Sequence, residues 1–193
     1  MPTQSRNSSD CHFDSSQSSG LQEKALHIVA SSLPRKIISG GQTGVDRAAL
    51  DWAISRAIPH GGWCPRGRIA LDGRLADHYA LQETESPGYS ERTRCNVRDA
   101  DATLILSQGD PAGGSKLTQR IALRIGKPVF IVALESDWRE QADLVREWLF
   151  SNEVLILNVA GPSENRVPGI YRQALEFLEM TYFSQTYASK AGG

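Results

Sequence analysis

The sequence predicts an α/β domain built on a doubly wound parallel sheet of about five or more strands, with helices on both faces. Short apolar segments alternate along the chain with longer stretches of helical periodicity, which is typical of βαβ units. Three apolar segments are nearly continuous (103–106, 129–132 and 154–157), as expected for strands that helices cover on both faces. Together these patterns predict a single domain of Rossmann-like fold.

Each element has its own signal in the sequence. The apolar runs predict strands at Lys36–Ser39, His60–Cys64, Ala102–Ser107, Pro128–Ala133 and Val154–Asn158. Apolar residues at helical spacing predict helices at Val45–Ala57, Ser115–Ile125, Trp138–Phe150 and Pro168–Phe183, and a further helix begins within residues 83–96. A long polar connection runs from Pro65 to about Pro87, and loops of that length in a compact domain are often functional.

The two ends of the chain differ from its middle in composition. Residues 1 to about 20 are rich in Ser, Asp, Gln and Asn. We therefore expect residues 1–33 to form a disordered or partly helical tail, with a short helix at Leu21–Ala30. A transit peptide is the weaker alternative, because the segment also carries Asp10 and Asp14. We expect the ligand-binding domain at 34–184 and a flexible tail at 185–193.

Composition narrows the class of protein. The 193 residues carry a formal net charge of −1, so no global basic field favours nucleic acid or an anionic membrane. No apolar run is long enough to span a bilayer. The three cysteines fit neither a zinc pattern nor a disulfide framework, and the four histidines are scattered, so we expect a cytoplasmic protein without a protein-ligated metal.

The first predicted strand runs into a glycine turn that opens a helix. The turn and the start of the helix read Gly40-Gly41-Gln42-Thr43-Gly44-Val45-Asp46-Arg47. Glycines permit positive φ angles and a close backbone approach, and the unpaired N–H groups at a helix start attract anions. The string matches neither a Walker A loop nor a dinucleotide-binding fingerprint. It predicts a phosphate-binding turn, the alternative being a tight turn with nothing bound.

A second glycine turn follows the third predicted strand. Gly113-Gly114-Ser115 opens the next helix, and Thr118 lies one turn further on. Because parallel strands end at the same edge of a sheet, both turns are expected to converge on one ligand.

Two further groups of residues are candidates for ligand contact. Trp63 could stack on a flat heterocycle, and Pro65 is a further candidate for ligand contact. Arg66 and Arg68 would bring guanidinium groups to a phosphate. Arg92, Thr93 and Asn96 share one helix face and could reach the same ligand. The alternatives are a buried Trp63 with solvated arginines, and a capped surface helix.

The chain resembles the molybdenum carrier protein family. The resemblance rests on the strings Ile38–Asp51 and His60–Pro65, on Tyr89, Arg92-Thr93 and Asn96-Val97, and on Leu157–Pro162 with Pro168–Tyr171. It covers roughly residues 36–183. It implies a Rossmann-like fold related to the LONELY GUY proteins, long labelled lysine decarboxylases, whose wider group binds nucleotides or nucleotide-derived ligands. It also implies molybdenum cofactor (molybdopterin) as cargo, molybdoenzymes as recipients and a homo-oligomer.

One departure from the related enzymes bears on activity. The LONELY GUY enzymes use Pro-Gly-Gly-x-Gly-Thr-x-x-Glu, with the glutamate in phosphoribohydrolase chemistry, and Thr118 takes the glutamate position here. Without that carboxylate the obvious general acid or base is missing, although Asp46 or Glu83 could substitute. The leading hypothesis is therefore a non-catalytic carrier of molybdenum cofactor or a similar phosphorylated pterin or nucleotide. A nucleoside-monophosphate phosphoribohydrolase and a nucleotide-sensing module are the alternatives.

Overall fold

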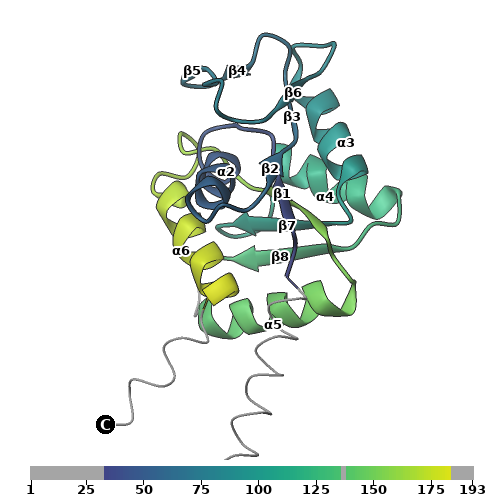
Figure 1. Cartoon of the computed structure of the whole chain (residues 1–193), viewed down its shortest axis with the longest axis vertical. Helices are drawn as coiled ribbons and strands as arrows, with labels where there is room; N and C mark the ends of the chain where they lie inside the picture. Colours follow the sequence, from purple (N-terminus) through teal and green to yellow (C-terminus); the bar gives the residue numbers. More distant parts are fainter. Residues whose placement is uncertain (1–32, 136–137, 184–193) are drawn as a thin grey trace, which may run out of the picture. The chain divides into compact units, whose positions relative to one another are not determined.

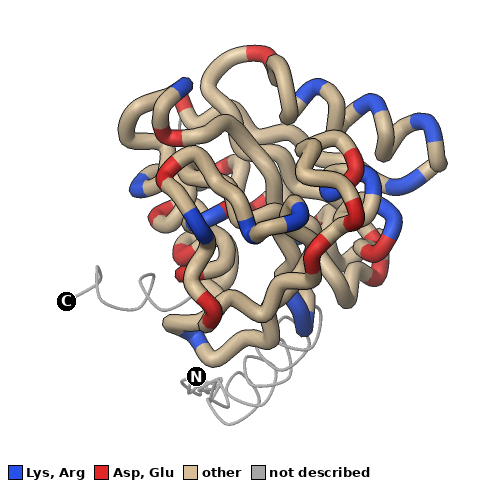
Figure 2. Tube along the Cα trace, turned by 90° about the horizontal axis from the view of Figure 1, so that it is seen from above, with Lys and Arg blue, Asp and Glu red and all other residues tan. Residues whose placement is uncertain are grey.

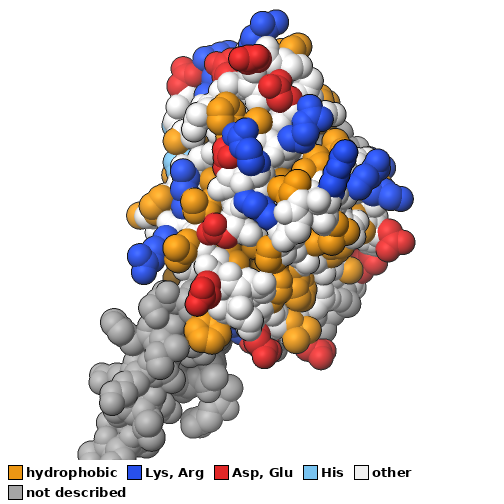
Figure 3. Space-filling model, turned by 90° about the vertical axis from the view of Figure 1, so that its right-hand side faces the viewer, with side chains coloured by type: hydrophobic (Ala, Val, Ile, Leu, Met, Phe, Trp, Pro, Cys, Tyr) orange, Lys and Arg blue, Asp and Glu red, His pale blue; other side chains and the backbone are white. Residues whose placement is uncertain are grey.

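The computed structural model describes residues 33–135 and 138–183 (Figure 1, Figure 2 and Figure 3). Its strands are β1 (Lys36–Ile38), β2 (His60–Gly61), β3 (Trp63–Cys64), β4 (Ile69–Ala70), β5 (Gly73–Arg74), β6 (Gln82–Glu83), β7 (Ala102–Ser107), β8 (Val129–Ala133) and β9 (Ile156–Ala160). Its helices are α2 (Val45–Ser55), α3 (Tyr89–Asp99), α4 (Gly114–Arg124), α5 (Trp138–Ser151) and α6 (Ile170–Phe183). The predicted tail helix at 21–30 and the C-terminal tail at 185–193 lie outside the described residues.

The main sheet has five parallel strands in the order β2-β1-β9-β7-β8, which confirms the predicted α/β class. In the usual doubly wound order, 3-2-1-4-5, the central strand comes first in the chain. Here the central strand, β9, comes last. The strand order is therefore that of a doubly wound sheet whose first strand has moved to the C-terminal side of the sequence.

Helices cover both faces of this sheet (Figure 1). One face packs α2, α5 and α6 around a continuous apolar core that includes Leu104, Leu157 and Phe177. The other face carries α3 and α4, which contact each other. On that second face the strands bear several small polar side chains, such as Thr103, which accepts a 3.2 Å hydrogen bond from the amide of Asn158. None of the described helices has the length and apolar content needed to cross a membrane.

The prediction of one continuous strand at His60–Cys64 is wrong, because Gly62 divides it into two short strands. β2 joins the main sheet beside β1, whereas β3 pairs with β6 in a separate two-stranded sheet. Gly62 has a φ of +119°, and a Cβ there would overlap the carbonyl oxygen of Ser39. The glycine thus lets the chain turn sharply while staying against β1.

The long connection predicted at 65–87 forms an ordered excursion with its own small core. Leu50, Cys64, Ala70, Leu75, Tyr79 and Leu81 make up that core. Arg68, only 8 % exposed, donates hydrogen bonds to the carbonyls of Leu75, Ala76, Tyr79 and Leu81. Its guanidinium group therefore holds the excursion together and does not face solvent.

Candidate functional site

Three loops meet at the carboxyl edge of the central strands. They follow β1 (39–44), β9 (161–169) and β7 (108–113). The hydroxyl of Ser39 donates a 2.6 Å hydrogen bond to the carbonyl of Val159, and a Cβ on Gly161 would overlap the carbonyl of Leu106. The edge beside the central strand is where a doubly wound sheet binds its ligands.

In the first glycine turn, the protein itself fills the space beside each glycine. The guanidinium group of Arg92 lies where a Cβ of Gly40 would be. A Cβ on Gly41 would come within 2.8 Å of Leu81, and one on Gly44 would overlap the carbonyl of Pro162. These glycines therefore admit neighbouring parts of the chain.

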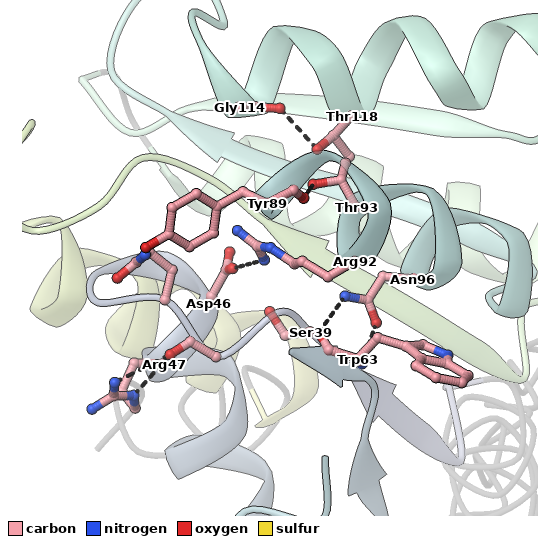
Figure 4. A network of polar contacts seen from close by, with 12 residues as sticks. Ser39, Asp46, Arg47, Trp63, Tyr89, Arg92, Thr93, Asn96, Gly114 and Thr118 are labelled. Carbon is pink, nitrogen blue, oxygen red and sulfur yellow. Dashed lines mark hydrogen bonds and ion pairs between the residues drawn. The ribbon is translucent and has the colours of Figure 1, made fainter. Parts of the chain in front are cut away.

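A buried ion pair crosses this turn (Figure 4). Arg92 Nη1, on α3, lies 2.5 Å from Asp46 Oδ2, in the first turn of α2, and the two side chains are 15 % and 4 % exposed. Two nearby polar atoms are buried without a hydrogen-bond partner: Arg92 Nε and the hydroxyl oxygen of Thr43. Buried polar atoms are normally hydrogen-bonded, so these two call for an explanation such as a ligand or ordered water.

Gln42 and Arg47 connect the first turn to the excursion. The Gln42 side-chain oxygen accepts hydrogen bonds from the amides of Thr43 and Leu71, at 2.9 and 2.8 Å. Arg47 donates to the carbonyl of Gly41 and pairs with both carboxylate oxygens of Asp72. Both side chains, predicted to contact ligand, thus have partners within the protein.

The second glycine turn is more open. Gly113 has a φ of +55° and begins α4 without a side-chain cap, and nothing lies within 4 Å of a Cβ on Gly114. The guanidinium group of Arg166, from the loop after β9, lies beside Gly113. No ion pair among the described residues involves Arg166. Sequence reasoning missed Arg166, because only the topology brings the β9 loop to this turn.

The N-terminus of α6, in contrast, is capped by a side chain of the protein itself. The carboxylate of Glu164 accepts hydrogen bonds from the amides of Gly169 and Tyr171, at 2.6 and 2.9 Å. A carboxylate on these amides satisfies the positive end of the helix. Of the three helices that follow the loops after β1, β7 and β9, α2 and α4 lack a side-chain cap.

Two of the polar residues predicted at the site, Thr118 and Thr93, bond to their own helices, and a third, Ser115, is buried. The hydroxyl of Thr118 donates to the carbonyl of Gly114 at 3.0 Å, and that of Thr93 donates to the carbonyl of Tyr89 at 2.9 Å (Figure 4). Ser115 is 4 % exposed in the first turn of α4.

Trp63 and Asn96 form a separate contact between β3 and α3. The Asn96 amide bonds both the N–H and the carbonyl of Trp63, and the indole N–H donates to Asp99 at 2.7 Å. In Figure 4 the indole extends away from Asp46 and Arg92. Pro65 is buried and Arg66 is exposed on the excursion. The structure thus does not bring Trp63 to the glycine turns.

A hydrogen-bonded triad fixes the excursion to the helices behind the site. Asp51, on α2, accepts from the hydroxyls of Tyr79 and Tyr171 at 2.6 and 2.8 Å. Burial, with the bond to Asp51, raises the pKa of Tyr171 to about 12 and lifts the pKa of Tyr79 above its usual range. Within the described residues, no three His, Cys, Asp or Glu side chains are grouped so as to hold a metal ion.

The doubly wound sheet, with its glycine turns at the edge beside a central strand, defines a Rossmann-like α/β protein. The chain belongs to the circularly permutated YpsA SLOG family, whose model matches residues 37–182. That description agrees with the strand order, in which the central strand comes last.

A solved structure supports the same assignment. The chain is similar to the "Putative molybdenum carrier protein" from Syntrophus aciditrophicus SB, whose crystal structure is known: the two sequences are 46 % identical and the two structures superpose with a TM-score of 0.76. The match covers 77 % of this chain and 94 % of that one. None of the curated proteins matches this sequence.

Proposed function

We propose that this protein is a non-catalytic carrier of molybdenum cofactor, or of a similar phosphorylated pterin or nucleotide, with the phosphate at the start of α4. The observation that carries the proposal is the second glycine turn: an uncapped helix start, open space at Gly114 and the guanidinium group of Arg166, which has no ion-pair partner among the described residues. Backbone N–H groups, the helix dipole and a cation favour a phosphate at one point. The name of the Syntrophus relative supports molybdenum-related cargo.

The first turn would then contact another part of the ligand. Its glycines are packed against the protein, but the Thr43 hydroxyl and Arg92 Nε have no hydrogen-bond partner in the described part of the chain and could bond a polar edge of the ligand. The metal would stay on the dithiolene of the cofactor, and the chain would hold the phosphate. We further propose a cytoplasmic location and molybdoenzymes as recipients.

The positions that could support hydrolysis favour the carrier over a phosphoribohydrolase. Thr118 stands where the related enzymes have glutamate, and its hydroxyl is bonded to Gly114. Asp46 is paired with Arg92, and Glu83 accepts a hydrogen bond from the amide of Gly67. The Asp46 carboxylate is therefore occupied by its cation, and the carrier is favoured chiefly because Thr118 offers no carboxylate at the position of the catalytic glutamate.

The test is to purify the protein from cells that make molybdenum cofactor and to measure bound molybdenum, pterin and nucleotide. Wild type should hold molybdenum and pterin in nearly equal amounts. Gly114→Asp should lower both at least about tenfold, since a charged hydrogen bond contributes about 1.5–3 kcal/mol. Gly114→Ala adds bulk without charge, so it should lower both less than Gly114→Asp does and thereby separate the effect of charge from that of volume. A bound nucleotide without molybdenum would contradict molybdenum cofactor as the cargo, and free base released from nucleoside monophosphates would contradict a non-catalytic carrier.

A further inference from the structure

Few aromatic side chains are exposed in the part of the chain that the structure describes. Tyr89, Phe150 and Phe183 are 41 %, 57 % and 42 % exposed, whereas the other described aromatic residues are at least partly buried. Phe150 and Phe183 lie in the last turns of α5 and α6, which follow parallel strands and therefore end at the opposite edge of the sheet from the glycine turns. The helix α3 instead leads into β7, so Tyr89, its first residue, lies at the carboxyl edge.

Contacts with the first glycine turn hold the Tyr89 ring in place. The guanidinium carbon of Arg92 lies 5.8 Å from the centre of that ring. Arg92 in turn pairs with Asp46 and lies where a Cβ of Gly40 would be. The Tyr89 carbonyl accepts a 2.9 Å hydrogen bond from the hydroxyl of Thr93, which fixes the backbone from which the ring extends. The ring is thus both exposed and positioned by a buried ion pair.

The second glycine turn lies on the same face of the sheet as Tyr89. The helix that it opens, α4, packs against α3. In the view of Figure 4, Tyr89 lies between Gly114, at the start of α4, and Asp46, in the first turn of α2. A ligand whose phosphate sits at the start of α4 and whose other end reaches the first glycine turn therefore passes the Tyr89 ring.

Tyr89 has the free ring that Trp63 lacks. The Trp63 indole N–H is bonded to Asp99, and the guanidinium carbon of Arg98 lies 5.9 Å from the centre of the indole ring. Figure 4 shows the Tyr89 ring and the Trp63 indole on opposite sides of the ion pair between Arg92 and Asp46. No described aromatic ring packs against Tyr89. Tyrosine supplies a large, rigid contact surface at a low cost in conformational entropy.

We propose that Tyr89 stacks on the heterocycle of the ligand, in the role that the sequence predicted for Trp63. This inference rests on the proposed phosphate site at the start of α4. Backbone N–H groups at a helix start bind any phosphate, whereas an aromatic side chain adds affinity only when the ligand presents a flat π face. Tyr89 therefore selects phosphorylated pterins and nucleotides over sugar phosphates and inorganic phosphate.

Two probes separate stacking from phosphate binding. Guanosine monophosphate carries a base, and ribose 5-phosphate has the same phosphorylated sugar without one. Each is titrated into the full ¹⁵N-labelled chain, and the amide shifts of Gly114 and Ser115 give the dissociation constant. The variants are Tyr89→Ala and Tyr89→Phe, with Phe150→Ala as the matched control, an exposed aromatic residue at the opposite edge. Both positions are exposed, so all three variants should fold, which circular dichroism would verify.

Tyr89→Ala should raise the dissociation constant of guanosine monophosphate at least about fivefold, the effect of losing one base–aromatic stack. Tyr89→Phe and Phe150→Ala should leave that constant unchanged, and no variant should alter the affinity for ribose 5-phosphate. The guanine C8 proton should shift upfield on binding to wild type and to Tyr89→Phe, but not on binding to Tyr89→Ala.

The outcomes distinguish this inference from the phosphate site on which it rests. If Tyr89→Ala binds guanosine monophosphate as wild type does, or loses affinity for both probes equally, the stacking role of Tyr89 is overturned and the phosphate site stands. If wild type binds neither probe, the phosphate site is contradicted, and this inference with it.

Discussion

The buried ion pair between Asp46 and Arg92 makes a quantitative prediction about stability. Arg92→Met keeps most of the side-chain volume but leaves the Asp46 carboxylate, 4 % exposed, without its cation. Breaking such a pair from one side costs about 3–5 kcal/mol. For a domain of this size, each kcal/mol lowers the melting temperature by about 2–4 °C, so we expect a loss of roughly 6–20 °C.

The assay is urea and thermal unfolding followed by circular dichroism, with a matched control on the surface. Arg172→Met removes the exposed pair with Glu176, whose partners are 84 % and 48 % exposed, and should cost less than about 1 kcal/mol. The double variant Asp46→Leu/Arg92→Met removes both charges and should recover most of the lost stability. An Arg92→Met variant that is no less stable than Arg172→Met would refute the reasoning.

Three further predictions concern the parts that surround the site. Gly62→Ala forces a side chain into a φ of +119° and against Ser39, so it should lower the unfolding free energy by at least about 1–3 kcal/mol in urea titrations, while Gly114→Ala leaves it unchanged or higher. Stability should fall as pH rises from about 10 toward the Tyr171 pKa of about 12, because the unfolded tyrosine ionises first, and Tyr171→Phe should flatten that fall in urea midpoints measured against pH. Arg68→Met removes the guanidinium donor that four carbonyls share, so limited proteolysis should cut within 65–87 faster than in wild type; unchanged cleavage would contradict its role.

The fold was predictable where an element is fully buried, because burial requires a run of apolar residues. Every residue of β7, Ala102–Ser107, is buried, and its bounds agree with the prediction, because a strand covered on both faces reads as a continuous apolar run. The predicted strand Val154–Asn158 begins two residues before β9, because Val154 is buried although its backbone does not yet pair with a neighbouring strand. The prediction of one strand at 60–64 is wrong because Gly62 packs against Ser39. That contact is distant in sequence, so no local pattern could indicate it.

The site was predictable in its backbone and less so in its side chains. Both glycine turns lie at the expected edge, because each follows a parallel strand and opens a helix. Which side chains have partners within the protein depends on contacts distant in sequence, such as Arg47 with Asp72 and Trp63 with Asp99. Arg166 has no local signal at all, and it reaches Gly113 only because β9 lies beside β7 in the sheet.

The most direct test of the proposed phosphate site is a nuclear magnetic resonance titration of the full ¹⁵N-labelled chain. The probe is guanosine monophosphate, a stable compound that has the fused 2-amino-4-oxopyrimidine ring of pterins and carries a phosphate. We predict saturable shifts centred on the amides of Gly114 and Ser115, and their loss in Arg166→Glu. Shifts centred on Gly41 and Gly44 that persist in Arg166→Glu, or no saturable shift at either turn, would contradict the assignment.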